Sequence, residues 1–242
     1  MAIVAGYRRP GTLDEALGLL GEPGAVVLAG GTRLNAEPTP EPVVMVDLQA
    51  LGLDGVERAG DGALRIGAMT TLQQVVDDDR APVAVREAAR RAEPSTLRAA
   101  ATVGGCVATA EPASELLATL LVHDALVELT GGDGKRTVPL AALLADPARL
   151  TGRIVTAVTI ETTGVTSAAR AGRTRADRPI VAAVARRTVD GRRLLALTGV
   201  AATPVLVANV DELAPPGDFL GSSEYRGALA RTLAARALAG VA

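Results

Sequence analysis

The sequence predicts an α+β fold with mixed sheets and an antiparallel unit near its C-terminal end. Three observations lead to this prediction. Short apolar strands alternate with amphipathic helices in the first half of the chain. Two strand-like runs flank Asp190-Gly191, a strong hairpin signal. The 242 residues, 48% of them hydrophobic, are enough to bury a sizeable core.

The first elements along the chain have clear sequence boundaries. Residues 12–20 are expected to form a helix, because Thr12 can cap it and Glu15 completes a capping box. Its leucines and Ala16 share one apolar face. Strands are then expected over 25–29, 43–48 and 63–69, and helices near 71–78 and 81–92.

The second half of the chain reads as further helices and strands. A helix is expected over 113–125, and strands over 126–129, 136–140, 152–161, 181–189, 192–202 and 200–208. The region 209–220 is expected to be a loop because of Pro215-Pro216. The last helix is expected over 222–239, with Ser222 or Ser223 as its cap.

Composition excludes several classes of function. The formal charge of −2, without a basic block, argues against nucleic acid or an anionic membrane as the main partner. One histidine, His123, and one cysteine, Cys106, cannot make a zinc site of the usual ligands or an iron–sulfur cluster, so no metal is expected. A lone cysteine and an N-terminus without a basic n-region predict a cytoplasmic protein.

Two glycine pairs suggest a binding site. Gly30-Gly31-Thr32 follows an expected strand, and Gly104-Gly105 repeats the device. Bare backbone lets N–H groups approach a phosphate, and threonine adds a hydroxyl donor. Either pair alone also fits a tight turn; together they could clamp the two phosphates of a pyrophosphate. No G-x-G-x-x-G opens a helix after a strand, so a Rossmann site is unsupported.

Three other features have ordinary structural interpretations. The run Gly131–Lys135 resembles a P-loop only superficially, and its spacing favours a hairpin turn. His123 lies at the end of a leucine-rich helix and is expected to be structural. Cys106 has no sequence-local base and is expected to be a small buried residue rather than a nucleophile.

Several stretches together resemble one protein family. LAGGTRL (28–34) and TVGGCVATAEPASELLATLLVHDALVEL (102–129) are similar to the two flavin loops of the FAD-binding medium subunit of the molybdenum hydroxylases, the carbon monoxide dehydrogenase and xanthine dehydrogenase type. The opening YRRPGTLDEALGLL and the stretches 64–75 and 218–238 also fit this family, so the resemblance spans nearly the whole chain.

The resemblance implies a domain organisation. A two-part FAD-binding domain of the molybdopterin dehydrogenase (PCMH-like) type is expected over 1–165, with subdomains at about 1–55 and 56–165. A C-terminal α+β domain, shortened relative to the family, is expected over 166–242.

The resemblance also implies which residues bind FAD. The first loop contributes Leu28, Ala29, Gly30, Gly31, Thr32, Arg33 and Leu34. The second contributes Thr102, Gly104, Gly105, Cys106, Ala108, Thr109, Ser114 and Glu115. Glu115 replaces an aspartate that would hold the adenosine ribose. Ile154 and Val155 match apolar residues near the isoalloxazine, and Arg170 matches a basic residue near the flavin.

The resemblance implies an FAD-dependent oxidoreductase subunit that relays electrons between an iron–sulfur and molybdenum partner and an acceptor. Cys106 replaces the family's usual asparagine, and the family's aromatic residues near the flavin have no counterpart in 167–181. Two alternatives therefore stay open: a free-standing flavoenzyme acting on a small molecule, in specialised metabolism for example, and a binding module whose flavin is lost or structural. No catalytic residue is assigned.

Overall fold

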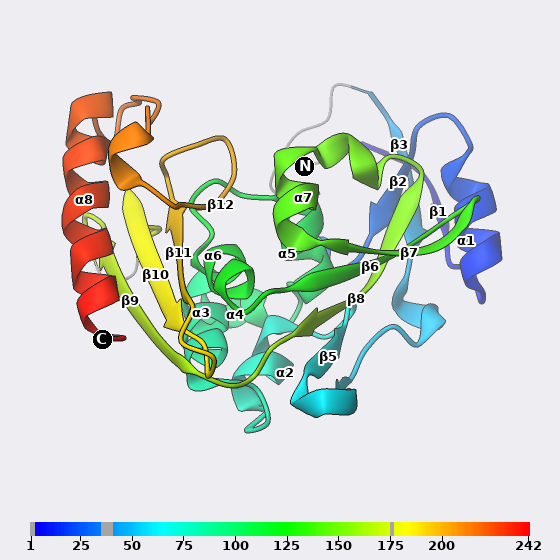
Figure 1. Cartoon of the computed structure of the whole chain (residues 1–242). Helices are drawn as coiled ribbons and strands as arrows, with labels where there is room; N and C mark the ends of the chain where they lie inside the picture. The colour runs from blue at the N-terminus through cyan, green and yellow to red at the C-terminus, as the bar shows by residue number, and fades with distance from the viewer. Residues whose placement is uncertain (1–2, 35–40, 175–176) are drawn as a thin grey trace.

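Three sheets organise the protein, whose computed structural model describes residues 3–34, 41–174 and 177–242 (Figure 1). The first is a parallel sheet of β1 (Val4–Arg8), β3 (Val43–Asp47) and β2 (Ala25–Leu28), in that order. The second is antiparallel, in the order β4 (Val56–Arg58), β5 (Leu64–Gly67), β8 (Arg153–Ile160), β6 (Leu126–Gly131) and β7 (Gly134–Pro139). The third, also antiparallel, has the order β12 (Val205–Leu206), β11 (Arg193–Thr198), β10 (Val181–Arg187) and β9 (Val165–Ala171).

Eight α-helices lie around these sheets in the described part of the chain. They are α1 (Leu13–Leu20), α2 (Leu72–Asp77), α3 (Val83–Ala92), α4 (Ser95–Arg98), α5 (Val103–Thr109), α6 (Glu115–Val122), α7 (Leu140–Ala145) and α8 (Ser223–Ala239). Short 3₁₀ helices span Gln49–Leu51, Gly60–Gly62, Pro147–Leu150 and Val210–Glu212. None of these helices has both the length and the apolar character needed to cross a bilayer.

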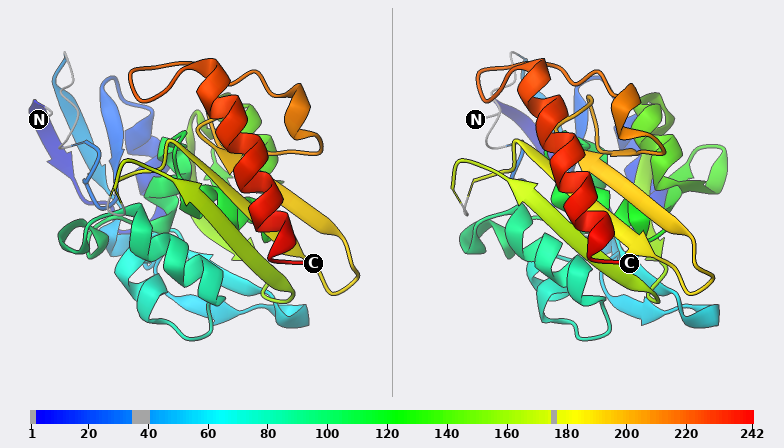
Figure 2. Two further views of the ribbon diagram at one scale, coloured as in Figure 1. Left: turned by 90° about the vertical axis from the view of Figure 1, so that its left-hand side faces the viewer. Right: turned by 60° about the vertical axis from the view of Figure 1, so that its left-hand side comes forward.

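Helix α6 lies between the two larger sheets (Figure 1). All of its residues are buried, and its apolar residues share one cluster with Val127 and Val158 of the five-stranded sheet and Val184 of β10. On the other face of the four-stranded sheet, α8 runs diagonally across the strands (Figure 2). There Ala230, Leu233, Ala234 and Ala237 pack on Val181, Ala183 and Ala185. Successive side chains of β10 point to opposite faces of the sheet, so one set packs on α6 and the other on α8. The strand is therefore buried on both faces.

Buried polar groups fix the junction of the two larger sheets. Arg186, which is 1% exposed, donates to the carbonyl oxygens of Val122 and Thr163. The His123 ring contacts the Glu161 carbonyl oxygen at 2.6 Å and the Thr166 hydroxyl at 3.2 Å. Burial lowers the His123 pKa to about 4, so the ring is neutral at pH 7. The structural interpretation of His123 is confirmed.

The α+β class and most expected elements are confirmed. Thr12 accepts a hydrogen bond from the Glu15 N–H and caps α1. The expected capping box is only half made, because the Glu15 carboxylate accepts from the Gly11 N–H rather than from Thr12. Ser222 caps α8.

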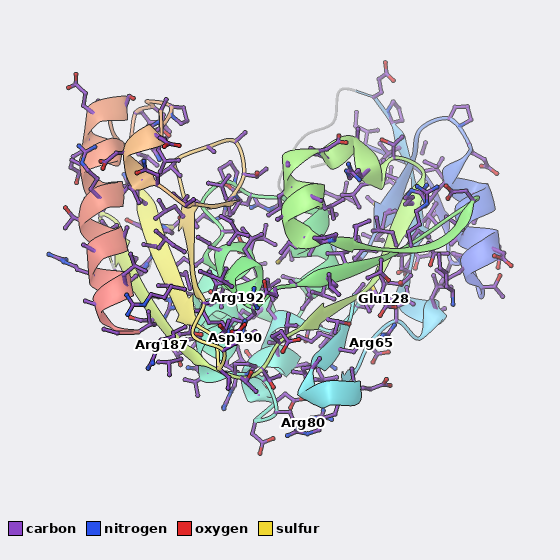
Figure 3. All side chains as sticks on the ribbon, in the orientation of Figure 1. Arg65, Arg80, Glu128, Arg187, Asp190 and Arg192 are labelled. Carbon is purple, nitrogen blue, oxygen red and sulfur yellow. The ribbon has the colours of Figure 1, made fainter. Side chains whose placement is uncertain are left out.

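Both expected hairpins are present. Gly131 pairs with Gly134 across a two-residue loop, so this glycine-rich run is a turn and not a P-loop. Gly134, at φ 97°, adopts a left-handed conformation that favours glycine. Asp190 and Arg192 form an ion pair at the tip of the β10–β11 hairpin (Figure 3). Arg65 of β5 and Glu128 of β6 form another across β8, through two hydrogen bonds of 2.7 and 2.8 Å (Figure 3).

Other expectations need correction. The strand expected over 200–208 shrinks to Val205–Leu206. The second glycine segment, expected to be a loop, forms helix α5. The sequence did not indicate β1, β4, β9 or α7. The three sheets occupy residues 4–47, 56–160 and 165–206; the domain boundaries at 55 and 165, and the shortening of the C-terminal domain, stay predictions.

Candidate functional site

A cavity of about 430 Å³ opens where the three sheets approach one another. Its walls come from the segment after β2, from α5 and the turn that follows it, from the start of β8, and from the segment between β9 and β10. All of the expected cofactor-binding residues line this cavity except Leu28 and Arg170. Leu28 packs instead beside Val43 and Met45 in the small sheet. The structure thus brings together segments far apart in the sequence.

The first glycine pair forms an open turn at the end of β2. A Cβ on Gly30 would lie 1.8 Å from the Ala100 carbonyl oxygen, so only glycine fits against that backbone. Gly31 has a φ of 69°, in the left-handed region. Within the described residues, the N–H groups of Gly30, Gly31 and Thr32 donate to no protein acceptor. This turn therefore presents backbone donors at the cavity.

The second glycine pair differs, because its backbone donors are already used. The Val103 N–H donates to the Thr70 carbonyl and the Gly104 N–H to the Ala68 carbonyl. The Gly105 N–H donates to the hydroxyl of Thr102, which caps α5. This helix end has no spare donors for a phosphate, and the suggestion that both pairs clamp a pyrophosphate through the same backbone device is wrong for α5.

Close packing explains Gly104, whereas Gly105 faces the cavity. A Cβ on Gly104 would approach the Cβ of Ala68 to 2.7 Å and its carbonyl oxygen to 2.9 Å. A Cβ on Gly105 would meet only the Thr102 hydroxyl oxygen, at 3.0 Å. Gly105 thus keeps one wall of the cavity flat.

Ser114 and Glu115 begin helix α6 at the far end of the second segment. The Ser114 hydroxyl accepts from the Leu117 N–H and caps the helix. The Glu115 carboxylate, only 5% exposed, lies 2.7 Å from the Nε of Arg170 and 3.2 Å from the Nε of Arg91. Arg170 therefore lies behind Glu115 rather than in the cavity wall, and Glu115 is a buried anion held between two guanidinium groups.

A chain of ion pairs follows one side of the cavity. Glu111 Oε2 lies 2.5 Å from Arg33 Nη2 and 3.1 Å from Arg178 Nη1. Arg178 Nη2 in turn lies 3.3 Å from Glu93 Oε1. All four residues line the cavity. Of these four residues the sequence indicates only Arg33, because the others come from separate segments and no local motif marks them.

Apolar side chains form another part of the wall. These are mainly Leu48, Met69, Leu150, Ile154 and Val155. No aromatic side chain of the described residues lines the cavity, in agreement with the missing aromatic residues of 167–181, of which 175–176 lie outside the described part.

Cys106 also contributes to the wall and packs against the main core. Burial raises the pKa of its thiol to about 12, so the thiol stays protonated at neutral pH. The residue expected to be buried is thus half-buried, because it packs on the core and also lines the cavity.

Comparison with known proteins identifies the family. Residues 3–161 match the model of the FAD binding domain in molybdopterin dehydrogenase. This chain belongs to that family. It is of the FAD-binding medium-subunit type found in carbon monoxide and xanthine dehydrogenases, and the cavity lies mainly within the matched FAD-binding domain.

Individual relatives extend the comparison. The uncharacterised protein YgfM of Escherichia coli K12 is 37% identical over 219 residues, which cover 88% of this chain and 82% of YgfM. The carbon monoxide dehydrogenase medium chain of Afipia carboxidovorans is 33% identical over 144 residues, 54% of this chain and 49% of that one. Two of the relatives are named as subunits of dehydrogenases, which are oxidoreductases.

Solved structures confirm the fold of this FAD-binding subunit type. A carbon monoxide dehydrogenase chain of Hydrogenophaga pseudoflava superposes with a TM-score of 0.88 at 22% identity, covering 100% of this chain and 98% of that one. Reconstituted CO dehydrogenase from Oligotropha carboxidovorans gives 0.86 at 26% identity, with the same coverage. The likeness at 22% identity shows the fold alone.

Proposed function

We propose that this chain binds FAD in the cavity and relays electrons between an iron–sulfur and molybdenum partner and a final acceptor. One observation supports this most directly: a single cavity, in a domain of an FAD-binding family, is lined by both glycine segments. Its volume of about 430 Å³ falls within the usual range of ligand pockets.

The residues present fit the chemistry of FAD. The donors of Gly30, Gly31 and Thr32 would hold the pyrophosphate, because backbone N–H groups without a protein acceptor stabilise anionic oxygens. Ser114 and Glu115 would lie toward the adenosine ribose. The apolar wall at Ile154 and Val155 would exclude water from the isoalloxazine. Bound FAD supplies the electron-transfer chemistry, and the protein supplies binding, orientation and electrostatics.

The iron and molybdenum in this proposal belong to partner chains. A chain with one cysteine cannot hold a cluster that needs about four thiolates. Some relatives are named as parts of larger assemblies, such as the 6-hydroxypseudooxynicotine dehydrogenase complex subunit alpha of Paenarthrobacter nicotinovorans, which is 33% identical over 145 residues. We therefore expect a small iron–sulfur subunit and a large molybdenum subunit as partners.

Cofactor identity is the first test. The purified chain should be yellow and should release FAD, not FMN, when denatured, as judged by chromatography of the released flavin. Metal analysis of the same sample should show neither iron nor molybdenum. Release of FMN alone, or failure to take up flavin from excess FAD, would refute the proposal.

A free-standing flavoenzyme is the second candidate, favoured by Cys106 and by the absence of aromatic side chains from the described cavity wall. The FAD-loaded chain is mixed anaerobically with NADH and other small reductants while the flavin absorbance is followed. The relay role predicts that organic substrates do not bleach the flavin until an iron–sulfur partner is added. Rapid bleaching by a small organic substrate alone would replace the relay role with this second function.

A further inference from the structure

We propose that Glu111 competes inside the cavity with the pyrophosphate of the cofactor, so that Arg33 and Arg178 exchange Glu111 for phosphate oxygens when a dinucleotide binds. This inference rests on the proposed function. It concerns four charged residues of the cavity wall, three of which the family resemblance does not assign.

Two guanidinium groups from different parts of the fold meet one carboxylate oxygen. Arg33 follows β2 of the first sheet, and Arg178 precedes β10 of the third. Both contact Oε2 of Glu111, at 2.5 and 3.1 Å. A guanidinium carries five N–H donors, and its fork matches phosphate as well as carboxylate. Here two guanidinium groups share one carboxylate oxygen. A diphosphate has more oxygens and more negative charge, so it can replace the carboxylate as their partner.

The position of Arg33 favours this exchange. It follows directly after Gly30, Gly31 and Thr32, whose N–H groups have no acceptor within the described chain. These donors adjoin Arg33 in the sequence and line the same cavity, so an anion that they hold lies close to Arg33. The carboxylate of Glu111 faces the same cavity and repels that anion.

Exposure distinguishes Glu111 from Glu115, a second carboxylate of the cavity wall that two arginines hold. The Glu115 side chain is only 5% exposed, so its charge is held inside the protein by Arg91 and Arg170. The Glu111 side chain is 30% exposed, and its partners Arg33 and Arg178 are 31% and 44% exposed. Water can solvate these guanidinium groups during the exchange, which makes this contact reversible and of low energetic cost.

The test measures binding of FAD, ADP and riboflavin to the flavin-free full chain and to Glu111→Gln. Glutamine keeps the shape and one amide oxygen, and loses the charge. We expect Kd for FAD and ADP to fall roughly tenfold in the variant, because one repulsive charge near a diphosphate is removed. Riboflavin, which has no phosphate, should bind both proteins equally. The gain should shrink as salt concentration rises.

Two further variants make the test specific. Glu128→Gln is the matched control, since Glu128 is 32% exposed, pairs with Arg65 at 2.7 Å, and neither residue lines the cavity; its Kd should change less than about threefold. Arg178→Gln should weaken FAD binding and reduce the gain from Glu111→Gln in the double variant. Circular dichroism checks that each variant is folded.

The outcomes separate this inference from the function on which it rests. If neither the original chain nor any variant binds FAD, the proposed function fails. If FAD binds and Glu111→Gln leaves its Kd unchanged or raises it, Glu111 is not a competitor and the inference is overturned. If riboflavin gains as much as FAD, the effect does not come from phosphate, and the inference is equally overturned.

Discussion

The two glycine pairs look alike in the sequence and differ in the fold. Gly30-Gly31 ends a strand in an open turn, where the N–H groups have no acceptor in the described chain. Gly104-Gly105 lies in the first turn of α5, where each N–H already donates to the protein. The first pair offers hydrogen-bond donors to a ligand. The second offers a flat, closely packed wall.

The difference shows that glycine has several physical uses in one site. Gly30 and Gly104 are required by neighbouring backbone and side chains, Ala100 in one case and Ala68 in the other. Gly31 is favoured by its left-handed φ. Of these four glycines, only Gly105 is a position where an added side chain would project mainly into the cavity. Substitutions at these glycines should therefore separate effects on folding from effects on binding.

Gly30→Ala should have the largest effect. Its Cβ would lie 1.8 Å from the Ala100 carbonyl oxygen, and backbone cannot move aside easily. We expect the free energy of unfolding to fall by more than about 3 kcal/mol, measured by urea denaturation. Gly132→Ala is the control, because nothing lies within 4 Å of the added Cβ. Equal stability of the two variants would contradict the assigned backbone contact.

Gly105→Val should abolish flavin binding while the chain still folds. The valine would project into the cavity beside the Thr102 hydroxyl and block approach of a ligand. Titration with FAD should show a loss of about a hundredfold or more, which is about 2.8 kcal/mol. Gly105→Ala should lose less affinity, since a single methyl group projects less far. Tight FAD binding by the folded valine variant would place the ligand elsewhere.

Gly104→Ala should mainly reduce stability. Its Cβ would lie 2.7 Å from the Cβ of Ala68, so the helix or the strand end has to shift. The expected cost is about 1–3 kcal/mol in thermal or urea unfolding, with FAD affinity changed much less than in Gly105→Val. Ala68→Gly in the same chain should restore part of the stability. The absence of any restoration would argue against a direct clash between these residues.

Cys106→Ser should have the smallest effect. We expect FAD affinity within about threefold of the original chain and a stability loss of about 1 kcal/mol. The thiol, whose pKa is raised to about 12 by burial, should react slowly with thiol reagents at pH 8, because it stays protonated at that pH. A serine variant that binds flavin normally and yet loses activity would show that Cys106 takes part in the chemistry.

Local patterns predicted the elements that local interactions determine. Thr12 marks the start of α1, and Asp190-Gly191 marks a hairpin, because caps and turns depend on a few adjacent residues. Helix α5 was missed because two glycines disfavour helix in isolation, and packing against Ala68 outweighs this preference. Strand β9 has few β-branched residues and exists because β10 pairs with it.

In the candidate site, too, local features could be predicted and long-range contacts could not. Its glycines and the residues after them could be found from sequence, since they adjoin in two short stretches. The contact of Glu111 with Arg33 joins residues 78 positions apart, and that of Arg178 with Glu93 joins residues 85 apart. Such pairs arise only when the segments between them fold. Periodicity and spacing carry no information about them.

Helix α6 has a consequence for the folding unit of this protein. Every residue of this helix is buried, and the helix packs against α3 on one side and against β10 and β11 on another. A fragment ending at residue 161, where the family match ends, would expose the side that faces the third sheet. In this chain, the matched region therefore depends on the third sheet to cover α6.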